Sequence, residues 1–158
     1  MIIRPAAADD AAQIADFWAP LVAESVATFN SIPKTHDDVA EMIATRPCFL
    51  VAEDDGRVLG FVTYDQFRGG IGYRHTMEHT IIVDPAHNGR GAGRALMQAA
   101  IEHARAADVH ALWAGVSAEN VAGVAFHTSL GFQEVTVLEQ VGRKFDRWMD
   151  LVLMQKRL

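Results

Sequence analysis

The chain has 158 residues, of which half are hydrophobic and 22% are charged. This length and composition predict a single globular domain over residues 1–158 rather than a disordered chain. The formal net charge is −6 and the Lys and Arg residues are scattered, which argues against a nucleic-acid-binding protein. Cys48 is the only cysteine, so no intrachain disulfide can form and we expect a cytoplasmic protein. No run of about 18 apolar residues occurs and the N-terminus lacks a signal-peptide pattern, so neither a membrane span nor secretion is predicted.

The first half of the chain predicts a short strand, two helices and a hairpin. The strand covers residues 1–4. Apolar residues at helical spacing then form one face of the first helix, made of Ile14, Phe17, Trp18, Leu21 and Val22. A second helix begins near Thr35 and ends before Pro47. Two strands, 49–53 and 57–64, are joined by Asp54-Asp55-Gly56, a sequence typical of hairpin turns.

The second half alternates strands and helices. After a glycine-rich loop at 68–72, the expected elements are a strand over 75–83, a helix from Gly93 to about Ala107, a strand over 111–116, a helix over 120–130, and strands from Phe132 and over 144–154. Hairpins early and strand–helix–strand units late predict an α/β protein, in which helices cover both faces of a mixed sheet.

The loop between the 75–83 strand and the following helix is rich in small residues. It reads His87-Asn88-Gly89-Arg90-Gly91-Ala92-Gly93. Glycines leave the backbone amides unshielded, and the unpaired N–H groups of a helix N-terminus attract anions. The spacing matches neither the dinucleotide fingerprint nor a P-loop, so these residues alone leave open an anion site or a plain helix-start turn.

Two longer runs resemble the acetyl-coenzyme A signature of the GNAT superfamily of N-acetyltransferases. The first joins residues 76–85 to Arg90-Gly91-Ala92-Gly93-Arg94-Ala95-Leu96, and the second runs from Asn120 to Phe132. Asn88 stands where the family usually has Gln or Arg. The resemblance implies the GNAT fold, with a central mixed, largely antiparallel sheet flanked by helices on both faces, and acetyl-CoA as co-substrate. The expected coenzyme contacts are Ile81, Ile82, Val83, Asn88, Gly89, Arg90, Gly91, Ala92, Gly93, Arg94 and Asn120.

Four further features are similar to the phosphinothricin acetyltransferase branch of that superfamily. They are Ala27-Thr28-Phe29, Tyr73-Arg74, His127 and the run Lys144-Phe145-Asp146-Arg147-Trp148-Met149-Asp150. This resemblance implies a small amino-acid-like amine as acceptor and a homodimer. In the expected last strand, alternation places Lys144, Asp146, Trp148 and Asp150 on one polar face.

The resemblance also implies catalytic roles. Glu78 is the candidate general base for the substrate amine, and His127 is the candidate acid for the leaving thiolate. A backbone N–H between Ile81 and Val83 is expected to stabilise the oxyanion, provided that a β-bulge frees it from the sheet. Glu78 and His79 are neighbours on a strand, so they are expected on opposite faces. The histidines lack metal-ligand spacing, so no metal is expected.

The amine pocket has five candidate residues. Arg74, next to Tyr73, is the expected partner of a substrate carboxylate or phosphinate, because a guanidinium binds such groups with two hydrogen bonds. Phe29, Tyr64 and Trp148 are expected as walls, although each on its own also fits plain core packing.

Two other functions remain open. The first is an acetyltransferase for protein or peptide amines or for polyamines, which would share every coenzyme motif and differ only in the substrate cleft. The second is a non-catalytic acetyl-CoA sensor, which Asn88 favours, whereas the presence of Glu78, Asn120 and His127 argues against it.

Overall fold

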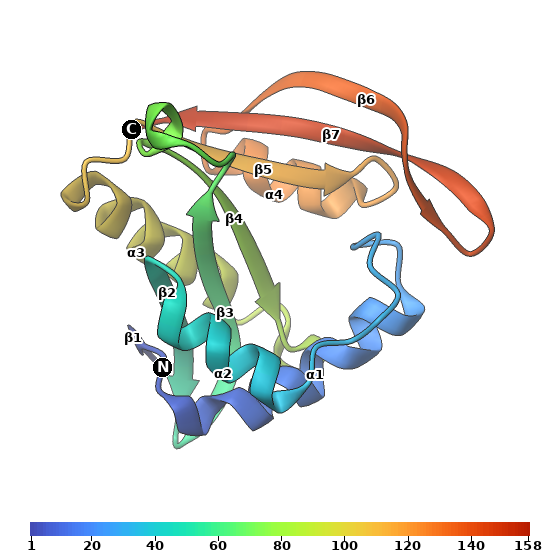
Figure 1. The fold of residues 1–158 in the computed structure, drawn as a ribbon. Helices are drawn as coiled ribbons and strands as arrows, with labels where there is room; N and C mark the ends of the chain where they lie inside the picture. The colour runs from blue at the N-terminus through green and yellow to red at the C-terminus, as the bar shows by residue number, and fades with distance from the viewer.

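The computed structural model describes residues 1–158 and shows one seven-stranded sheet covered by helices on both faces (Figure 1). The strand order is β1-β2-β3-β4-β5-β7-β6, and every neighbouring pair is antiparallel except β4 with β5. The predicted mixed, largely antiparallel sheet is therefore confirmed. The strands are β1 (Ile2–Pro5), β2 (Cys48–Asp54), β3 (Arg57–Gln66), β4 (Thr76–Val83), β5 (Ala111–Ser117), β6 (Gln133–Lys144) and β7 (Arg147–Arg157).

Helices α1 (Ala11–Glu24) and α2 (His36–Thr45) cover one face of the N-terminal half of the sheet. Thr35 begins α2 as predicted: its hydroxyl accepts from the Asp38 amide, and the Asp38 carboxylate accepts from the Thr35 amide. The predicted apolar face of α1 packs on Phe61 and its neighbours in β2 and β3. Trp18 meets Phe61 edge to face, with ring centroids 5.0 Å apart.

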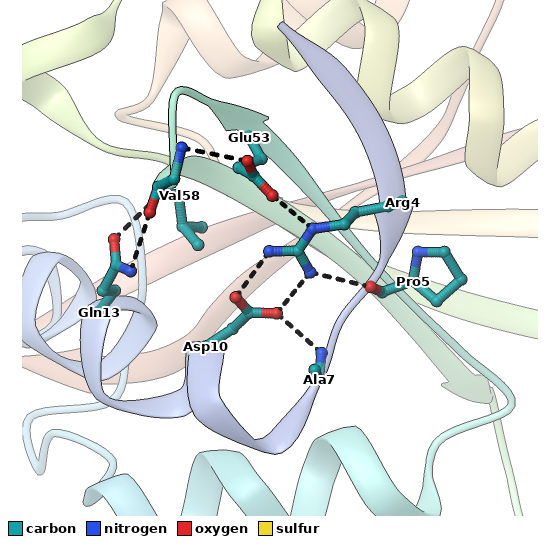
Figure 2. A network of polar contacts seen from close by, with 8 residues as sticks. Arg4, Pro5, Ala7, Asp10, Gln13, Glu53 and Val58 are labelled. Carbon is teal, nitrogen blue, oxygen red and sulfur yellow. Dashed lines mark hydrogen bonds and ion pairs between the residues drawn. The ribbon is translucent and has the colours of Figure 1, made fainter.

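A polar network fixes the start of α1 to the sheet (Figure 2). The Arg4 guanidinium donates to both carboxylate oxygens of Asp10, at 2.7 and 2.9 Å, and to Glu53 at 2.7 Å. Asp10 also accepts from the Ala7 amide, and Gln13 accepts from the Val58 amide. Hydrogen bonding to Arg4 holds the pKa of Asp10 below its ordinary value. The network therefore joins β1, α1 and the β2–β3 turn.

Helices α3 (Ala92–Ala106) and α4 (Val121–Ser129) lie on the opposite face and cover the larger core. Cys48 is buried in that core, and burial raises the pKa of its thiol to about 12, which favours the protonated thiol at neutral pH. Tyr64 is fully buried, and its hydroxyl is hydrogen-bonded to Nδ1 of His103 on α3 at 2.6 Å. The prediction that Tyr64 lines the amine pocket was wrong, because its side chain belongs to the core under α3.

Strands β4 and β5 pair only at their first residues. Their parallel register covers Thr76 with Ala111, Met77 with Leu112 and Glu78 with Trp113, and then stops. Each strand stays paired on its other edge, β4 with β3 up to Val83 and β5 with β7 up to Ser117. The two halves of the sheet therefore separate beyond Glu78, in the middle of the molecule.

The chain ends in a long β6–β7 hairpin that extends beyond the rest of the sheet (Figure 1). Lys144 ends β6, Arg147 begins β7, and the turn residues Phe145 and Asp146 have φ of 53° and 56°. The expected strand over 144–154 was therefore wrong at its start, since the chain reverses there. Lys144 and Asp146 do not share a face with Trp148; Lys144 is buried, and Asp146 lies in the turn.

Candidate active site

A cavity of about 310 Å³ lies where β4 and β5 separate. It is lined from both faces of the sheet, by the loop after α1 on one face and by α4 on the other. Its walls are Trp18, Ala27, Thr28, Phe29, Asn30, Glu78, His79, Thr80, Ile81, Ile82, Ala114, Gly115, Val116, Ser117, Asn120, His127 and Leu151. Both Glu78 and His79 line it, although strand alternation predicted that they would be separated.

Glu78 is the only acidic side chain in the lining. It is the last β4 residue paired with β5, and its carboxylate lies over Gly115, where a Cβ would be 3.0 Å from Glu78 Oε1. The carboxylate has no hydrogen-bond partner within the protein, and burial raises its pKa above the ordinary value. A partly desolvated carboxylate facing a cavity is suited to accept a proton from a bound amine.

His79 and His127 form a buried pair beside Glu78. Their Nε2 atoms are 2.9 Å apart, and His127 Nδ1 lies 2.7 Å from the carbonyl oxygen of Gly123. A carbonyl can only accept, so His127 donates from Nδ1. Burial lowers the pKa of both rings, that of His79 to about 3, so both are neutral at pH 7. His127 Nε2 therefore accepts from His79 Nε2–H.

This arrangement argues against the expected acid role of His127. His127 Nδ1–H donates to the Gly123 carbonyl, and the lone pair on His127 Nε2 accepts from His79. The ring thus has no free N–H to donate to a thiolate, and its lowered pKa disfavours taking up a second proton.

The predicted anion loop follows β4 directly and opens α3. Gly89 and Gly91 have φ of 80° and 81°, in the left-handed region that favours glycine, and a Cβ on either would face open space. No side chain caps the helix at Gly91, and the first backbone bond of α3 runs from the Ala95 amide to the Gly91 carbonyl. The amides of Ala92, Gly93 and Arg94 are therefore free to bind an anion such as a pyrophosphate.

Arg94 links α3 to α4, and Asn120 caps the start of α4. Arg94 donates to the Ser129 hydroxyl at the end of α4, while Asn88 and Arg90 are exposed. Asn120 Oδ1 caps α4 by accepting from the Gly123 amide at 2.9 Å, and the residue also lines the cavity. Its Nδ2 group therefore remains available for a ligand, so capping and ligand contact are compatible.

The prediction that a β-bulge frees a backbone N–H between Ile81 and Val83 was wrong. Strands β3 and β4 keep a continuous register from Gly60 with Val83 to Gln66 with Met77, so no bulge occurs there. The edge of β4 that faces β5 is unpaired beyond Glu78, because the two strands separate. Ile81 and Ile82 line the cavity along that edge, whereas Val83 does not.

Of the predicted amine-pocket residues, only Phe29 lines the cavity. Tyr73 and Arg74 lie in the exposed segment before β4, where Arg74 donates from Nε to His75 Nε2 at 2.8 Å. Trp148 is exposed on the distal hairpin, with the Arg143 guanidinium 5.2 Å from its ring centre. The single chain therefore does not bring these three residues to Glu78.

Several lining residues were not predicted as site residues: Trp18, Asn30, Thr80, Ala114, Gly115, Val116, Ser117 and Leu151. Gly115 could have been predicted as a site residue, because a glycine inside an otherwise apolar strand indicates the close approach of another group. Nothing in the sequence pattern marked Trp18 as a site residue, since its spacing fits the core face of α1 equally well. The remaining residues lie on β4, β5, β7 and the loop after α1, which come together only in the folded sheet.

The divided sheet and the glycine loop opening α3 define an acetyl-coenzyme A-dependent acetyltransferase of the GNAT type. A family model described as "Acetyltransferase (GNAT) family" matches residues 16–132, and the chain belongs to this family. The structure contains no helix long and apolar enough to cross a membrane. It also groups no three His, Cys, Asp or Glu side chains that could hold a metal ion.

Similar proteins cover the whole chain. An L-methionine sulfoximine/L-methionine sulfone acetyltransferase of Salmonella typhimurium is 36% identical over 100% of this chain and 95% of its own length. A structure titled ribosomal-protein-alanine N-acetyltransferase from Brucella melitensis is 37% identical, with a TM-score of 0.96 and full coverage of both chains. A putative acetyltransferase from Salmonella typhimurium, solved with acetyl-CoA, is 35% identical with a TM-score of 0.94, covering 99% of this chain and 93% of its own.

Proposed function

We propose that the protein transfers the acetyl group of acetyl-CoA to the primary amine of a small amino-acid-like substrate. Phosphinothricin, methionine sulfoximine and methionine sulfone are the model acceptors. The observation that carries this proposal is the unpartnered Glu78 carboxylate, which faces the cavity between the free edge of β4 and Gly115. The methionine sulfoximine/sulfone acetyltransferase of Salmonella typhimurium, similar over 95% of its length, supports the choice of acceptor.

In this mechanism the free amides at the start of α3 hold the pyrophosphate of the coenzyme, and Asn120 Nδ2 holds the pantetheine arm. Glu78 removes a proton from the ammonium group of the substrate, either directly or through a water molecule, so that the nitrogen can attack the thioester carbonyl. An unpaired N–H on the β4 edge stabilises the oxyanion. As the intermediate collapses, its nitrogen loses the second proton to solvent, and solvent protonates the leaving thiolate, because both ring nitrogens of His127 are already engaged.

The cavity favours a small acceptor over an amine on a folded protein. Its volume of about 310 Å³ is at the lower end of the range for small-ligand sites. The walls combine one carboxylate with mainly apolar and neutral polar groups. A non-catalytic sensor has no use for a desolvated, unpartnered carboxylate at the point where the strands separate.

We also propose a cytoplasmic homodimer. The outer edge of β6 is unpaired, and the hairpin exposes Val135, Val137, Val141, Phe145 and Trp148. A long edge strand with exposed apolar residues is a liability for a monomer, and a second copy of the chain would cover it. Light scattering at micromolar concentration is expected to give about 35 kDa, twice the 17.3 kDa of the chain.

Exchange of Glu78 for Gln tests the proposed base. Glu78→Gln keeps the shape of the side chain and removes its basicity, so kcat should fall by about 100-fold or more. The acetyl-CoA Kd, measured by calorimetry, should stay within about twofold, because the coenzyme amides are untouched. The matched control is Glu41→Gln, which alters an exposed glutamate on α2 and should retain full activity. Wild-type turnover by Glu78→Gln would contradict the assigned role.

A further inference from the structure

The buried ammonium group of Lys144 is not explained by the proposed chemistry. Lys144 is the last residue of β6 and is only 3% exposed. Its Nζ donates to the carbonyl oxygens of Val22 at 2.6 Å, Ser25 at 2.7 Å and Thr28 at 2.8 Å. An ammonium group has three donors, so its hydrogen-bonding capacity is filled. No carboxylate lies within ion-pair distance of the ammonium group, so three backbone carbonyls stabilise its charge instead.

The three carbonyls belong to the end of α1 and to the loop that follows. Val22 lies in the last turn of α1, where the carbonyls lack helical partners and the helix dipole is negative. Ser25 and Thr28 belong to the loop whose next residues, Phe29 and Asn30, line the cavity. Lys144 thus binds a segment more than 110 residues away in the sequence.

No other polar contact holds this loop to the sheet. The side-chain bonds of the loop are internal or local: Ser25 to Leu21, Ala27 to Ser25, and Asn30 to Thr28. The second attachment is by packing, since the Phe29 ring lies against Gly142 on β6, where any Cβ would overlap it. Lys144 and Gly142 together place Phe29 at the cavity wall.

From these contacts we propose that Lys144 is a positioning residue for the amine-binding side of the active site. It acts from the distal hairpin by fixing the loop of residues 25–30, which forms one wall of the cavity containing Glu78. The coenzyme loop, residues 88–94, opens α3, which packs in the other core from α1, and no hydrogen bond joins this loop to Lys144. The inference rests on the proposed acetyl transfer, and it assigns one wall of that site to the β6–β7 hairpin.

Lys144→Met tests this role, because methionine is similar in length and cannot donate. The kcat/KM for the amine should fall about 10- to 100-fold, as expected when a substrate wall shifts by about 1 Å. The acetyl-CoA Kd should change less than about twofold, because the amides that bind it are not in this loop. Lys144→Arg keeps the cation and its donors and should recover most of the loss. Lys34→Met is the matched control, since Lys34 is exposed and makes no hydrogen bond or ion pair.

Hydrogen exchange separates failure of this proposal from failure of the proposed function. In Lys144→Met, the amides of residues 25–30 should exchange at least about tenfold faster than in the wild type, while α3 and α4 remain protected. This result needs no turnover, so it holds even if no tested amine is a substrate. If Lys144→Met does not fold, Lys144→Gln, whose amide can still donate to two carbonyls, provides the same comparison. Unchanged exchange in the loop, or equal losses for amine and coenzyme, would overturn the positioning role.

Discussion

At the residue scale, the position of the proposed catalytic carboxylate, that of Glu78, depends on the absence of a side chain opposite it. Glu78 Oε1 occupies space that a Cβ at position 115 would approach to 3.0 Å. The sequence predicted Glu78 as the base, through the family resemblance, but it could not show which residue makes room for it. That partner lies on β5, 37 positions further along the chain, and only the sheet brings the two together.

Gly115→Ala should therefore reduce activity without unfolding the protein. The added methyl group displaces the Glu78 carboxylate from its position over β5, so kcat should fall by about tenfold or more. The acetyl-CoA Kd should be unchanged, and thermal unfolding should shift by only a few degrees. Gly69→Ala serves as the control, because a Cβ at this position meets no atom within 4 Å. Full activity in Gly115→Ala would mean that the carboxylate does not need this position.

The His79–His127 pair makes stability sensitive to acid. Folded His79 has a pKa near 3, whereas an unfolded histidine titrates near 6.5, so below pH 6.5 the unfolded chain binds more protons. The stabilisation is complete above pH 6.5 and is lost as the pH falls toward 3. Between pH 7 and pH 5 this histidine alone should lower the free energy of unfolding by about 2 kcal/mol.

Urea denaturation at the two pH values measures this effect. His79→Leu should show a fall smaller by about 2 kcal/mol than that of the wild type, since leucine cannot be protonated. The exposed His110 is the control position, and His110→Gln should keep the wild-type dependence. Identical pH dependence in His79→Leu and the wild type would show that the buried pair is not the acid-sensitive group.

At the element scale, the helices and the early strands could be predicted because the residues that specify them are close in sequence. The cap of α2 at Thr35, the hairpin at Asp54-Asp55-Gly56 and the glycines before α3 lie within a few residues of the structure they specify. The β6–β7 turn was missed for the converse reason. Phe145 and Asp146 adopt positive φ without glycine or asparagine, so the usual signal of a two-residue hairpin turn is absent.

The coenzyme loop gives a prediction at this scale. Gly91 has φ of 81°, which costs an L-residue about 1 kcal/mol or more, so Gly91→Ala should shift the loop out of its present conformation. Because the amides of residues 92–94 then lose their common direction, the acetyl-CoA Kd should rise by about tenfold. Calorimetry with Gly69→Ala as the control measures this, and unaltered coenzyme affinity would exclude the loop as the anion site.

At the scale of the whole molecule, the site exists because the sheet divides. Residues from α1, its following loop, β4, β5, β7 and α4 meet around one cavity, although they are spread from Trp18 to Leu151. Local patterns and the family resemblance together predicted the fold, and the resemblance gave the expected coenzyme contacts, where strand, loop and helix are consecutive. They did not predict the opposite wall, because its position depends on long-range contacts such as Lys144 with Thr28.

The proposed acetyl transfer is tested most directly by measuring free coenzyme A thiol when the purified protein is given acetyl-CoA and a panel of amines. The panel holds phosphinothricin, methionine sulfone, the common amino acids, spermidine and a basic peptide. We expect turnover on the amino-acid-like acceptors, with Glu78→Gln inactive and still able to bind acetyl-CoA. Turnover on the peptide or spermidine alone would contradict the proposed substrate class, and failure to bind acetyl-CoA would contradict the coenzyme site itself.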